Sequence, residues 1–272
     1  MKLFRFVIVL ATVLLAAPAL AGTFVLEGNP VQGGIMFGRV DPGCVVDFDS
    51  TYVLVSDDGI FVIGFRHDNK PWSVIHTRCP DGSRRRQFLK VEQREYDEQH
   101  IDGLPPEMVT PSAETLARIK ADAARVKAVH DVESDLRAFL SAFVWPVKGT
   151  ITGTFAARRV LNGEPRAPHF GLDIAAPEDT PVIATADGVV GLAEDLYLSG
   201  RTVILDHGHG ISSSYLHLAG IDVTAGQSVT QGQRIGSVGA SGRVTGAHLD
   251  WRFNWLRSRL DPVLVAGPMP EE

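Results

Sequence analysis

The sequence predicts a mainly β chain with a small N-terminal β domain, a helical connector and a C-terminal antiparallel β domain. Three observations support this prediction. Apolar and polar residues alternate over residues 23–95, and apolar residues then recur at helical spacing between Leu116 and Val129. From Trp145 onward the helical period disappears, and short strand-like runs alternate with glycine-rich turns. A chain of 272 residues has room for two domains and a connector.

Residues 1–21 have the three parts of a signal peptide. Lys2 and Arg5 supply a basic start, residues 6–17 form an apolar stretch that is short for a bilayer, and Ala19-Leu20-Ala21 offers a small-x-small cleavage site. We therefore expect a mature chain that begins at Gly22, is exported to the periplasm and is soluble there. No membrane span is expected in the mature chain.

The charge balance argues against nucleic acid as a partner. The chain has a formal net charge of −6, and removal of Lys2 and Arg5 with the leader would make it two units more negative. No dense stripe of Lys and Arg is present to neutralise a phosphate backbone. The sequence carries no signal for the oligomeric state.

Residues 22–97 form the predicted small β domain. Its strands are separated by the turn signals Asp41-Pro42-Gly43, Asp57-Asp58-Gly59 and Pro80-Asp81-Gly82, and residues 53–62 give its clearest hairpin prediction. The chain's two cysteines, Cys44 and Cys79, both fall in this domain. In an oxidising compartment this favours a disulfide, with two buried thiols as the alternative.

Residues 98–144 are predicted to be a linker followed by a helix. A polar, proline-rich stretch ends in Thr110-Pro111, which is typical of a helix cap with proline at the first helical position. The helical stripe follows, with a break expected near His130-Asp131 and a second stripe at Leu136, Phe139 and Leu140. Such stripes are usually packing surfaces. The alternative is a lid over a catalytic groove.

Residues 145–266 contain the residues that carry chemistry. Residues 168–173 (Pro-His-Phe-Gly-Leu-Asp), 215–218 (Tyr-Leu-His-Leu) and 246–251 (Gly-Ala-His-Leu-Asp-Trp) place three His and two Asp in a β-rich segment. This is the residue chemistry of a catalytic metal site. In an extended strand His169 and Asp173 would be roughly 13 Å apart, so the chain between them must curl to bring both to one ion. Pro168 fixes φ there, and Gly171 tolerates positive φ.

His248 and Asp250 follow a different geometry. As residues i and i+2 of a strand they point from the same face, with Leu249 and Trp251 facing the core behind them. One of the pair can therefore bind a metal while the other faces the substrate.

Other polar residues in this region have weaker signals. Residues 153–171 are long for a loop and are predicted to form a groove wall, with Arg158, Arg159 and Asn162 as candidates for substrate contact. His207 and His209 are interpreted as parts of a tight turn with Gly208 and Gly210. Ser212–Ser214 near His217 raise a serine hydrolase as a rival, but no Gly-x-Ser-x-Gly elbow is present.

The region from Trp145 to about Leu264 resembles the lysostaphin/LytM-type zinc endopeptidases, in a proteobacterial-like exported form. The resemblance rests on the His-x-x-x-Asp of His169 and Asp173, on the segment 180–190 around Gly188-Val189-Val190, on residues 212–218 and on residues 223–251. It implies a lysostaphin-like antiparallel β-sheet or sandwich for the C-terminal domain. It also implies zinc as the cofactor and a peptide of peptidoglycan as the substrate.

The resemblance further implies roles for individual residues. His169 and Asp173 would be zinc ligands, and His217 and His248 would be catalytic residues that orient and deprotonate water and stabilise the oxyanion. The family typically ends this region in His-x-His, whereas this chain has His248-Leu249-Asp250. Asp is itself a zinc ligand, so Asp250 is expected to be the third ligand.

Two functions from different classes follow. The first is a zinc metalloendopeptidase that hydrolyses peptide bonds of peptidoglycan stem peptides or cross-links. The second is a catalytically impaired module of the same fold that binds cell-wall peptide or activates another hydrolase. The presence of His169, Asp173, His217 and His248 favours the enzyme.

Overall fold

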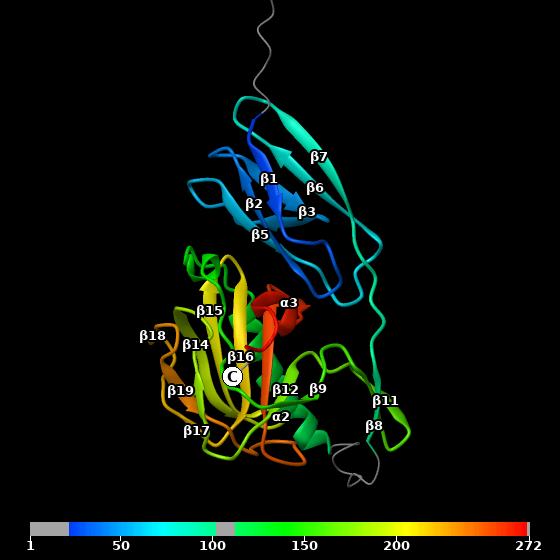
Figure 1. Cartoon of the computed structure of the whole chain (residues 1–272), viewed down its shortest axis with the longest axis vertical. Coiled ribbons are helices and arrows are strands. Elements are labelled where there is room, and N and C mark those ends of the chain that lie inside the picture. Colours follow the sequence, from blue (N-terminus) through cyan, green and yellow to red (C-terminus); the bar gives the residue numbers. More distant parts are fainter. Residues whose placement is uncertain (1–21, 102–111, 271–272) are drawn as a thin grey trace, which may run out of the picture.

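The computed structural model describes residues 22–101 and 112–270. The predicted signal peptide, residues 1–21, lies outside the described residues. The chain is mainly β, as predicted, with an N-terminal β region, a helix and a larger C-terminal sheet (Figure 1). No helix among the described residues is both long and apolar enough to cross a membrane.

The N-terminal region contains two antiparallel sheets. One has the order β1 (Phe24–Glu27), β2 (Ile35–Val40), β5 (Ile60–Gly64), and the other has the order β4 (Thr51–Val53), β3 (Val45–Phe48), β6 (Trp72–Arg78), β7 (Arg84–Lys90). In β6 the alternate residues Ser73, Ile75 and Thr77 are buried while their neighbours are not, which is the period of a strand with one face on a core. Cys44 and Cys79 are joined in a disulfide that ties the start of β3 to the end of β6.

The predicted hairpin over residues 53–62 is wrong. A turn does form there, in which the Ser56 hydroxyl accepts a hydrogen bond from the backbone N–H of Ile60 (2.9 Å). However, β4 pairs with β3 and β5 pairs with β2, so the turn connects two sheets. The turn residues fix the reversal of the chain, but burial against the core decides which strand becomes the partner.

The C-terminal region is built on one large mostly antiparallel sheet. Its order is β18 (Ser228–Val229), β14 (Gly188–Leu196), β15 (Gly200–Gly208), β16 (Ile211–Leu218), β20 (Leu249–Trp255), β12 (Leu172–Ala175), β9 (Thr150–Gly153), with β21 (Ser258–Leu260) also on β20. A smaller sheet has the order β13 (Pro181–Ile183), β19 (Arg234–Ser237), β17 (Gly220–Ile221).

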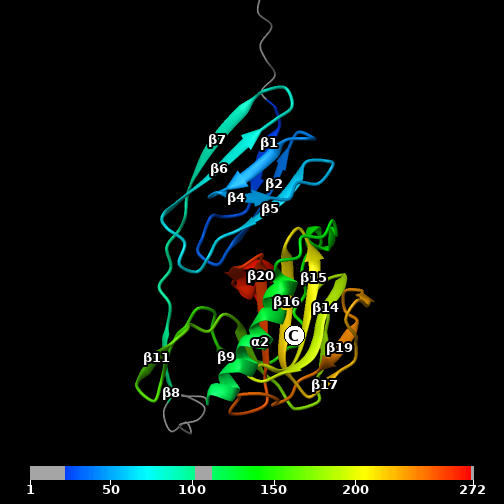
Figure 2. The same cartoon turned by 180° about the vertical axis from the view of Figure 1, so that it is seen from behind.

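The two faces of the large sheet have different coverings. Tyr215, Trp251 and Phe253 lie on one face and belong to the main hydrophobic core. The opposite face carries Ile204, which packs with Leu192 and Leu196 against the helix α2 (Ala113–His130). Figure 2 shows α2 crossing this face in front of β14–β16. Because both faces are covered, every residue of β16 is buried.

The connector differs in detail from the prediction. The helix begins at Ala113, and the Ser112 side chain caps it by accepting a hydrogen bond from the Thr115 N–H. The predicted cap Thr110-Pro111 lies outside the described residues, and the observed capping residue is Ser112, two residues after Thr110. The helix ends at His130, at the predicted break, and the second stripe forms only the short 3₁₀ turn η1 (Ala138–Leu140).

Contacts link the two β regions. The ring of Phe48 in β3 packs edge-on against Trp255 in β20, with centroids 5.9 Å apart. Arg94 forms an ion pair of 2.8 Å with Asp261, which caps the short helix α3 (Pro262–Ala266). A third, small sheet has the order β11 (Glu164–Arg166), β10 (Arg158–Leu161), β8 (Glu98–Ile101), in which β8 comes from the connector. The segment predicted to be a long loop before His169 is therefore partly a hairpin.

Candidate metal centre

Two neighbouring strands bring the predicted carboxylates together. Asp173 of β12 lies directly opposite Asp250 of β20 in the antiparallel register. Side chains of directly opposed residues start about 5 Å apart on the same face of a sheet. The register therefore joins two residues that are 77 positions apart in the sequence, which no local motif could specify.

The curl before Asp173 brings His169 to the same point. The backbone N–H of His169 donates to the carbonyl of Ala157 (2.9 Å), and its carbonyl accepts from the N–H of Ala156 (2.6 Å). The curl is as predicted, but the expected positive φ at Gly171 is wrong, because Gly171 is not among the residues with positive φ. A Cβ at Gly171 would come within 2.0 Å of Oδ1 of Asp250, so glycine is needed there for close approach.

The three predicted ligands form one cluster. Nε2 of His169 lies 3.0 Å from Oδ1 of Asp173 and 3.3 Å from Oδ2 of Asp250. All three ligand atoms lie within 4.8 Å of one another. Tetrahedral zinc holds its ligands at about 2.0–2.2 Å, which places neighbouring donor atoms roughly 3.3 Å apart. The spacing of these atoms fits such an ion.

The unpaired atoms of the cluster also fit a metal. Among the described residues, Nε2 of His169 and Oδ1 of Asp173 are buried and have no hydrogen-bond partner. Buried polar atoms without partners cost free energy, so such atoms usually serve a ligand. One imidazole and two carboxylates are a donor set that zinc accepts.

The two predicted catalytic histidines lie beside this cluster. The rings of His217 and His248 have centroids 5.0 Å apart, and Nε2 of His248 lies 3.7 Å from Oδ1 of Asp173. Nδ1 of His217 is 2.8 Å from the carbonyl of Ser241, and Nδ1 of His248 is 2.9 Å from that of Gly246. A carbonyl can only accept, so each Nδ1 carries the proton of the neutral ring. Each Nε2 is then left with a lone pair that can take a proton.

The backbone holds His217 in an uncommon conformation. Its φ is +66°, in the left-handed region that residues with a Cβ seldom adopt. Its N–H donates to the carbonyl of Ser199 at 2.9 Å, which helps to hold this conformation. Strain of this kind is concentrated at functional sites, where it aims a side chain. Burial also lowers the pKa of His217, which favours the neutral, proton-accepting ring.

Two arginines balance the charge of the two carboxylates in the cluster. The site prediction did not include either arginine as a ligand. Nε of Arg252 donates to Oδ1 of Asp250 at 2.8 Å, and Nη2 donates to Oδ2. Nη2 of Arg159, one of the residues predicted to contact substrate, lies 3.4 Å from Oδ2 of Asp173. Arg252 could have been found, because it stands two residues after Asp250 and so points from the same face of β20.

Burial and ion pairing act in opposite directions on the cluster. Burial raises the pKa of Asp250, but Arg252 and His169 outweigh it and hold that pKa well below its usual range. Burial lowers the pKa of His169, but the nearby carboxylates of Asp173 and Asp250 raise it by more. The two carboxylates therefore attract positive charge strongly, whether from a proton on His169 or from a cation.

The remaining histidines stay apart from the cluster. His207 is fully buried, with Nδ1 2.7 Å from the carbonyl of Asp187 and Nε2 2.8 Å from the Ser213 hydroxyl. His209 lies in the tight turn between β15 and β16, as predicted, with φ of +51°. A backbone carbonyl, that of Asp187, binds Nδ1 of His207 in the place where a serine hydrolase has a carboxylate, and Ser213 is completely buried, so this pair does not resemble a serine hydrolase site.

Comparison with known proteins agrees with this geometry. Residues 167–262 match the model of peptidase family M23. The chain is 44% identical over 107 residues to "Peptidoglycan DD-endopeptidase ShyA" of Vibrio cholerae, covering 39% of this chain and 25% of that protein. It is 40% identical over 103 residues to "DD-carboxypeptidase/endopeptidase Mpg" of Neisseria meningitidis, covering 38% of this chain and 24% of that protein. The match thus spans about a quarter of the length of these curated relatives.

One solved structure resembles most of the chain. It is a peptidase M23 protein from Pseudomonas aeruginosa, with a TM-score of 0.69 and 29% sequence identity, covering 89% of this chain and 96% of that one. The likeness therefore includes the N-terminal β region and the connector as well as the C-terminal sheet. Residues 167–262, which contain all five predicted site residues, are a peptidase family M23 domain.

Proposed function

We propose that this protein is a zinc-dependent endopeptidase that hydrolyses peptide bonds in peptidoglycan stem peptides or cross-links. The observation that carries the proposal is the convergence of three donor atoms, on His169, Asp173 and Asp250, next to two histidines with available Nε2 atoms. The names of the two curated relatives, both endopeptidases and one of them a peptidoglycan endopeptidase, support this substrate class.

The protein's own residues would share the work of the reaction. His169, Asp173 and Asp250 would hold the ion, which when bound polarises a carbonyl and makes water easier to deprotonate. His248, whose Nε2 lies 3.7 Å from Oδ1 of Asp173, would take the proton of the attacking water at Nε2. His217 would accept that proton in turn or in place of His248, and the ring that carries it would donate a hydrogen bond to the developing oxyanion and then return the proton to the leaving amine.

The site of action follows from the substrate. Peptidoglycan lies outside the cytoplasmic membrane, so the protein would act as an exported, periplasmic protein after removal of its predicted signal peptide. The N-terminal β region would then fold where its Cys44–Cys79 disulfide is stable.

The test is incubation of the purified protein with peptidoglycan, with and without a chelator, followed by mass spectrometry of the released peptides. We expect new peptide termini that disappear when the chelator is present and return when zinc is restored. Release of peptides that the chelator does not reduce would contradict the metal-dependent mechanism.

A second function has one specific observation in its favour. Arg252 and Arg159 engage the two carboxylates of the cluster, so its charge is balanced without an ion. A module of this kind would bind wall peptide or activate another hydrolase. Metal analysis of the purified protein separates the two functions, because the binding module predicts no zinc together with no chelator-sensitive hydrolysis.

A further inference from the structure

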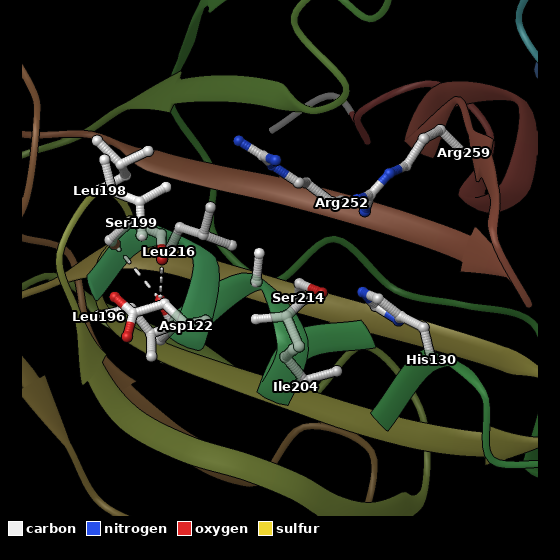
Figure 3. Close-up of a pocket in the computed structure, with 14 residues that line it drawn as sticks. Asp122, His130, Leu196, Leu198, Ser199, Ile204, Ser214, Leu216, Arg252 and Arg259 are labelled. Carbon is white, nitrogen blue, oxygen red and sulfur yellow. Dashed lines mark hydrogen bonds between the residues drawn. The ribbon is translucent and has the colours of Figure 1, made fainter. Parts of the chain in front are cut away.

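A cavity of about 170 Å³ lies between α2 and the large sheet (Figure 3). Its walls are mostly apolar and include Ile119 and Val126 from α2, Leu196 from β14 and Leu216 from β16. Arg252, which binds Asp250 on one side, also lines the cavity. The cavity and the metal cluster are therefore neighbours that share one side chain. An apolar cavity of about 150 Å³ can hold a benzene ring, so this one has room for a group of that size.

The two ends of the cavity differ in polarity. Figure 3 shows Asp122 near Leu196 at one end, and Arg259 and His130 at the other, close to Ser214. Asp122 already has its partners, because it accepts from Nη2 of Arg125 (2.8 Å) and from the backbone N–H of Tyr197 (2.7 Å). The acidic end is thus satisfied.

The cationic end is not satisfied. Among the described residues, no carboxylate lies within ion-pair distance of Arg259, whose recorded contacts are the side-chain oxygen of Asn254 (3.0 Å) and the face of the Phe170 ring. His130 is only 5% exposed and lines the same cavity, yet its Nε2 has no hydrogen-bond partner among these residues. Ser212 can donate to Nδ1 of His130 (2.9 Å), and Nε2 then carries a proton for a ligand.

The electrostatics at this end of the cavity favour an anion. Burial, together with the charge of the nearby Arg252, lowers the pKa of Arg259 to about 10. Burial also lowers the pKa of His130 to about 3, with Arg259 and Arg252 adding to the effect, so this ring is a neutral donor at physiological pH. Arg252 has the carboxylate of Asp250 as its partner, whereas Arg259 has no carboxylate within ion-pair distance among the described residues. A second carboxylate at Arg259 would relieve the repulsion between the two guanidinium groups.

We propose that this cavity is a substrate subsite that binds a short aliphatic chain ending in a carboxylate, with the carboxylate at Arg259 and His130 and the aliphatic part under α2. The inference rests on the proposed function, since it makes this chain one residue of the peptide substrate, next to the bond held at the metal cluster. It also gives α2 a role: the connector helix supplies one wall of the subsite.

The binding test uses small probes and needs no turnover. Pentanoate, pentanamide, propionate and acetate are titrated into the purified, chelator-treated protein, and binding is followed by NMR shifts of cavity residues. We expect pentanoate to bind about tenfold more tightly than pentanamide, because a charged hydrogen-bond acceptor gains more from a guanidinium than a neutral one. Affinity should also rise about three- to fourfold for each methylene added from acetate to pentanoate.

Two variants locate the binding. Arg259→Gln can keep the hydrogen bond to Asn254 but removes the charge, and it should reduce the affinity for pentanoate to that for pentanamide. Arg234→Gln is the matched control, because Arg234 is an exposed arginine of β19 that pairs with Asp222 (2.7 Å) far from the cavity. Equal binding of pentanoate and pentanamide by the wild type would overturn the proposal, even if Arg259→Gln failed to fold. Equal binding of acetate and pentanoate would overturn its aliphatic part.

Hydrolysis is measured separately, with peptide substrates that differ only in a free or amidated carboxylate beside the scissile bond. If the subsite acts on substrate, the free acid should have the lower KM and Arg259→Gln should erase the difference without a matching loss of kcat. Absence of all hydrolysis with intact pentanoate binding would contradict the proposed function and leave the subsite standing. Equal KM values for the free acid and the amidated peptide would contradict the subsite but not the proposed function.

Discussion

Arg252 donates two hydrogen bonds to Asp250, the residue two positions before it on the same face of β20. This fork holds the carboxylate in place while its Oδ2 stays 3.3 Å from Nε2 of His169. It also adds one positive charge next to a cluster that contains two carboxylates. The net charge of Asp250 and Arg252 together is therefore closer to zero than that of Asp250 alone, as for a neutral ligand.

Changes at Asp250 test this relationship. Asp250→Ala removes one donor atom and leaves Arg252 mostly buried without its carboxylate, so we expect loss of metal and a decrease of about 2 kcal/mol in the free energy of unfolding. Asp250→His keeps three donors and should retain the metal. Metal content and urea unfolding give the two readouts, with Asp222→Ala, an exposed acid in an ion pair, as the control. Full metal content in Asp250→Ala would remove Asp250 from the ligand set.

His169→Ala should lose metal and all chelator-sensitive hydrolysis. His169 is 2% exposed and contributes the donor atom that is common to both short contacts of the cluster. His76→Ala, at an exposed position in β6, is the matched control and should behave as the wild type. Metal analysis together with peptidoglycan digestion provides the check. Normal zinc content in His169→Ala would show that the ion binds elsewhere.

His217→Ala should separate metal binding from catalysis. We expect it to keep the metal and to lose at least about 100-fold in kcat, which is the usual scale for removal of a positioned proton-transfer group. Equal loss of metal and activity would instead make His217 a ligand. The left-handed conformation at His217 should be easier for His217→Asn than for His217→Ala, so the asparagine variant checks that any loss is chemical and not a backbone effect.

The candidate site residues could be selected from the sequence more readily than the strand pairings. His169, Asp173, His217, His248 and Asp250 stand in three short motifs that can be recognised in the sequence, and the pairing of β12 and β16 with β20 brings these motifs together. The hairpin at residues 53–62 failed because a turn signal does not specify which sheet each arm joins. Arg259 and His130 were not singled out as site residues because their meeting depends on how α2 packs, and no local pattern encodes that packing.

Stability should fall in mild acid because of His207. Burial lowers the pKa of His207 to about 4 in the folded protein, against about 6.5 in an unfolded chain. As the pH falls, the unfolded state therefore takes up a proton at His207 before the folded state does. The free energy of unfolding is highest above pH 6.5 and decreases as the pH falls from 6.5 toward 4. Between pH 7.5 and 5 this amounts to about 2 kcal/mol.

The measurement is urea unfolding at both pH values for the wild type and for His207→Gln. The variant cannot titrate, so its loss of stability in acid should be smaller than that of the wild type, whatever its absolute stability. His130, with a pKa of about 3, contributes in the same direction and remains in both proteins. An identical acid-induced loss in the two proteins would exclude His207 as a source.

Reduction of the Cys44–Cys79 disulfide should destabilise the N-terminal β region selectively. The bridge spans 35 positions, and closing a loop of that length is worth about 3–4 kcal/mol in the chain-entropy model. We expect Cys44→Ser/Cys79→Ser to unfold this region at a lower denaturant concentration while the metal content stays unchanged. Non-reducing mass spectrometry should find the two cysteine peptides linked in the wild type, and two free thiols would be the contrary result.

The pairing of β8 with β10 has a practical consequence for anyone who dissects this protein. A fragment that begins at Trp145 would discard β8 and α2 together. The hairpin β10–β11, which carries Arg159 toward Asp173, would then become an open edge, and Leu192, Leu196 and Ile204 would face water. Such a fragment should be poorly soluble, and its measured activity should be lower than that of the intact chain. The smallest fragment that keeps all the contacts of the C-terminal region therefore begins before residue 98.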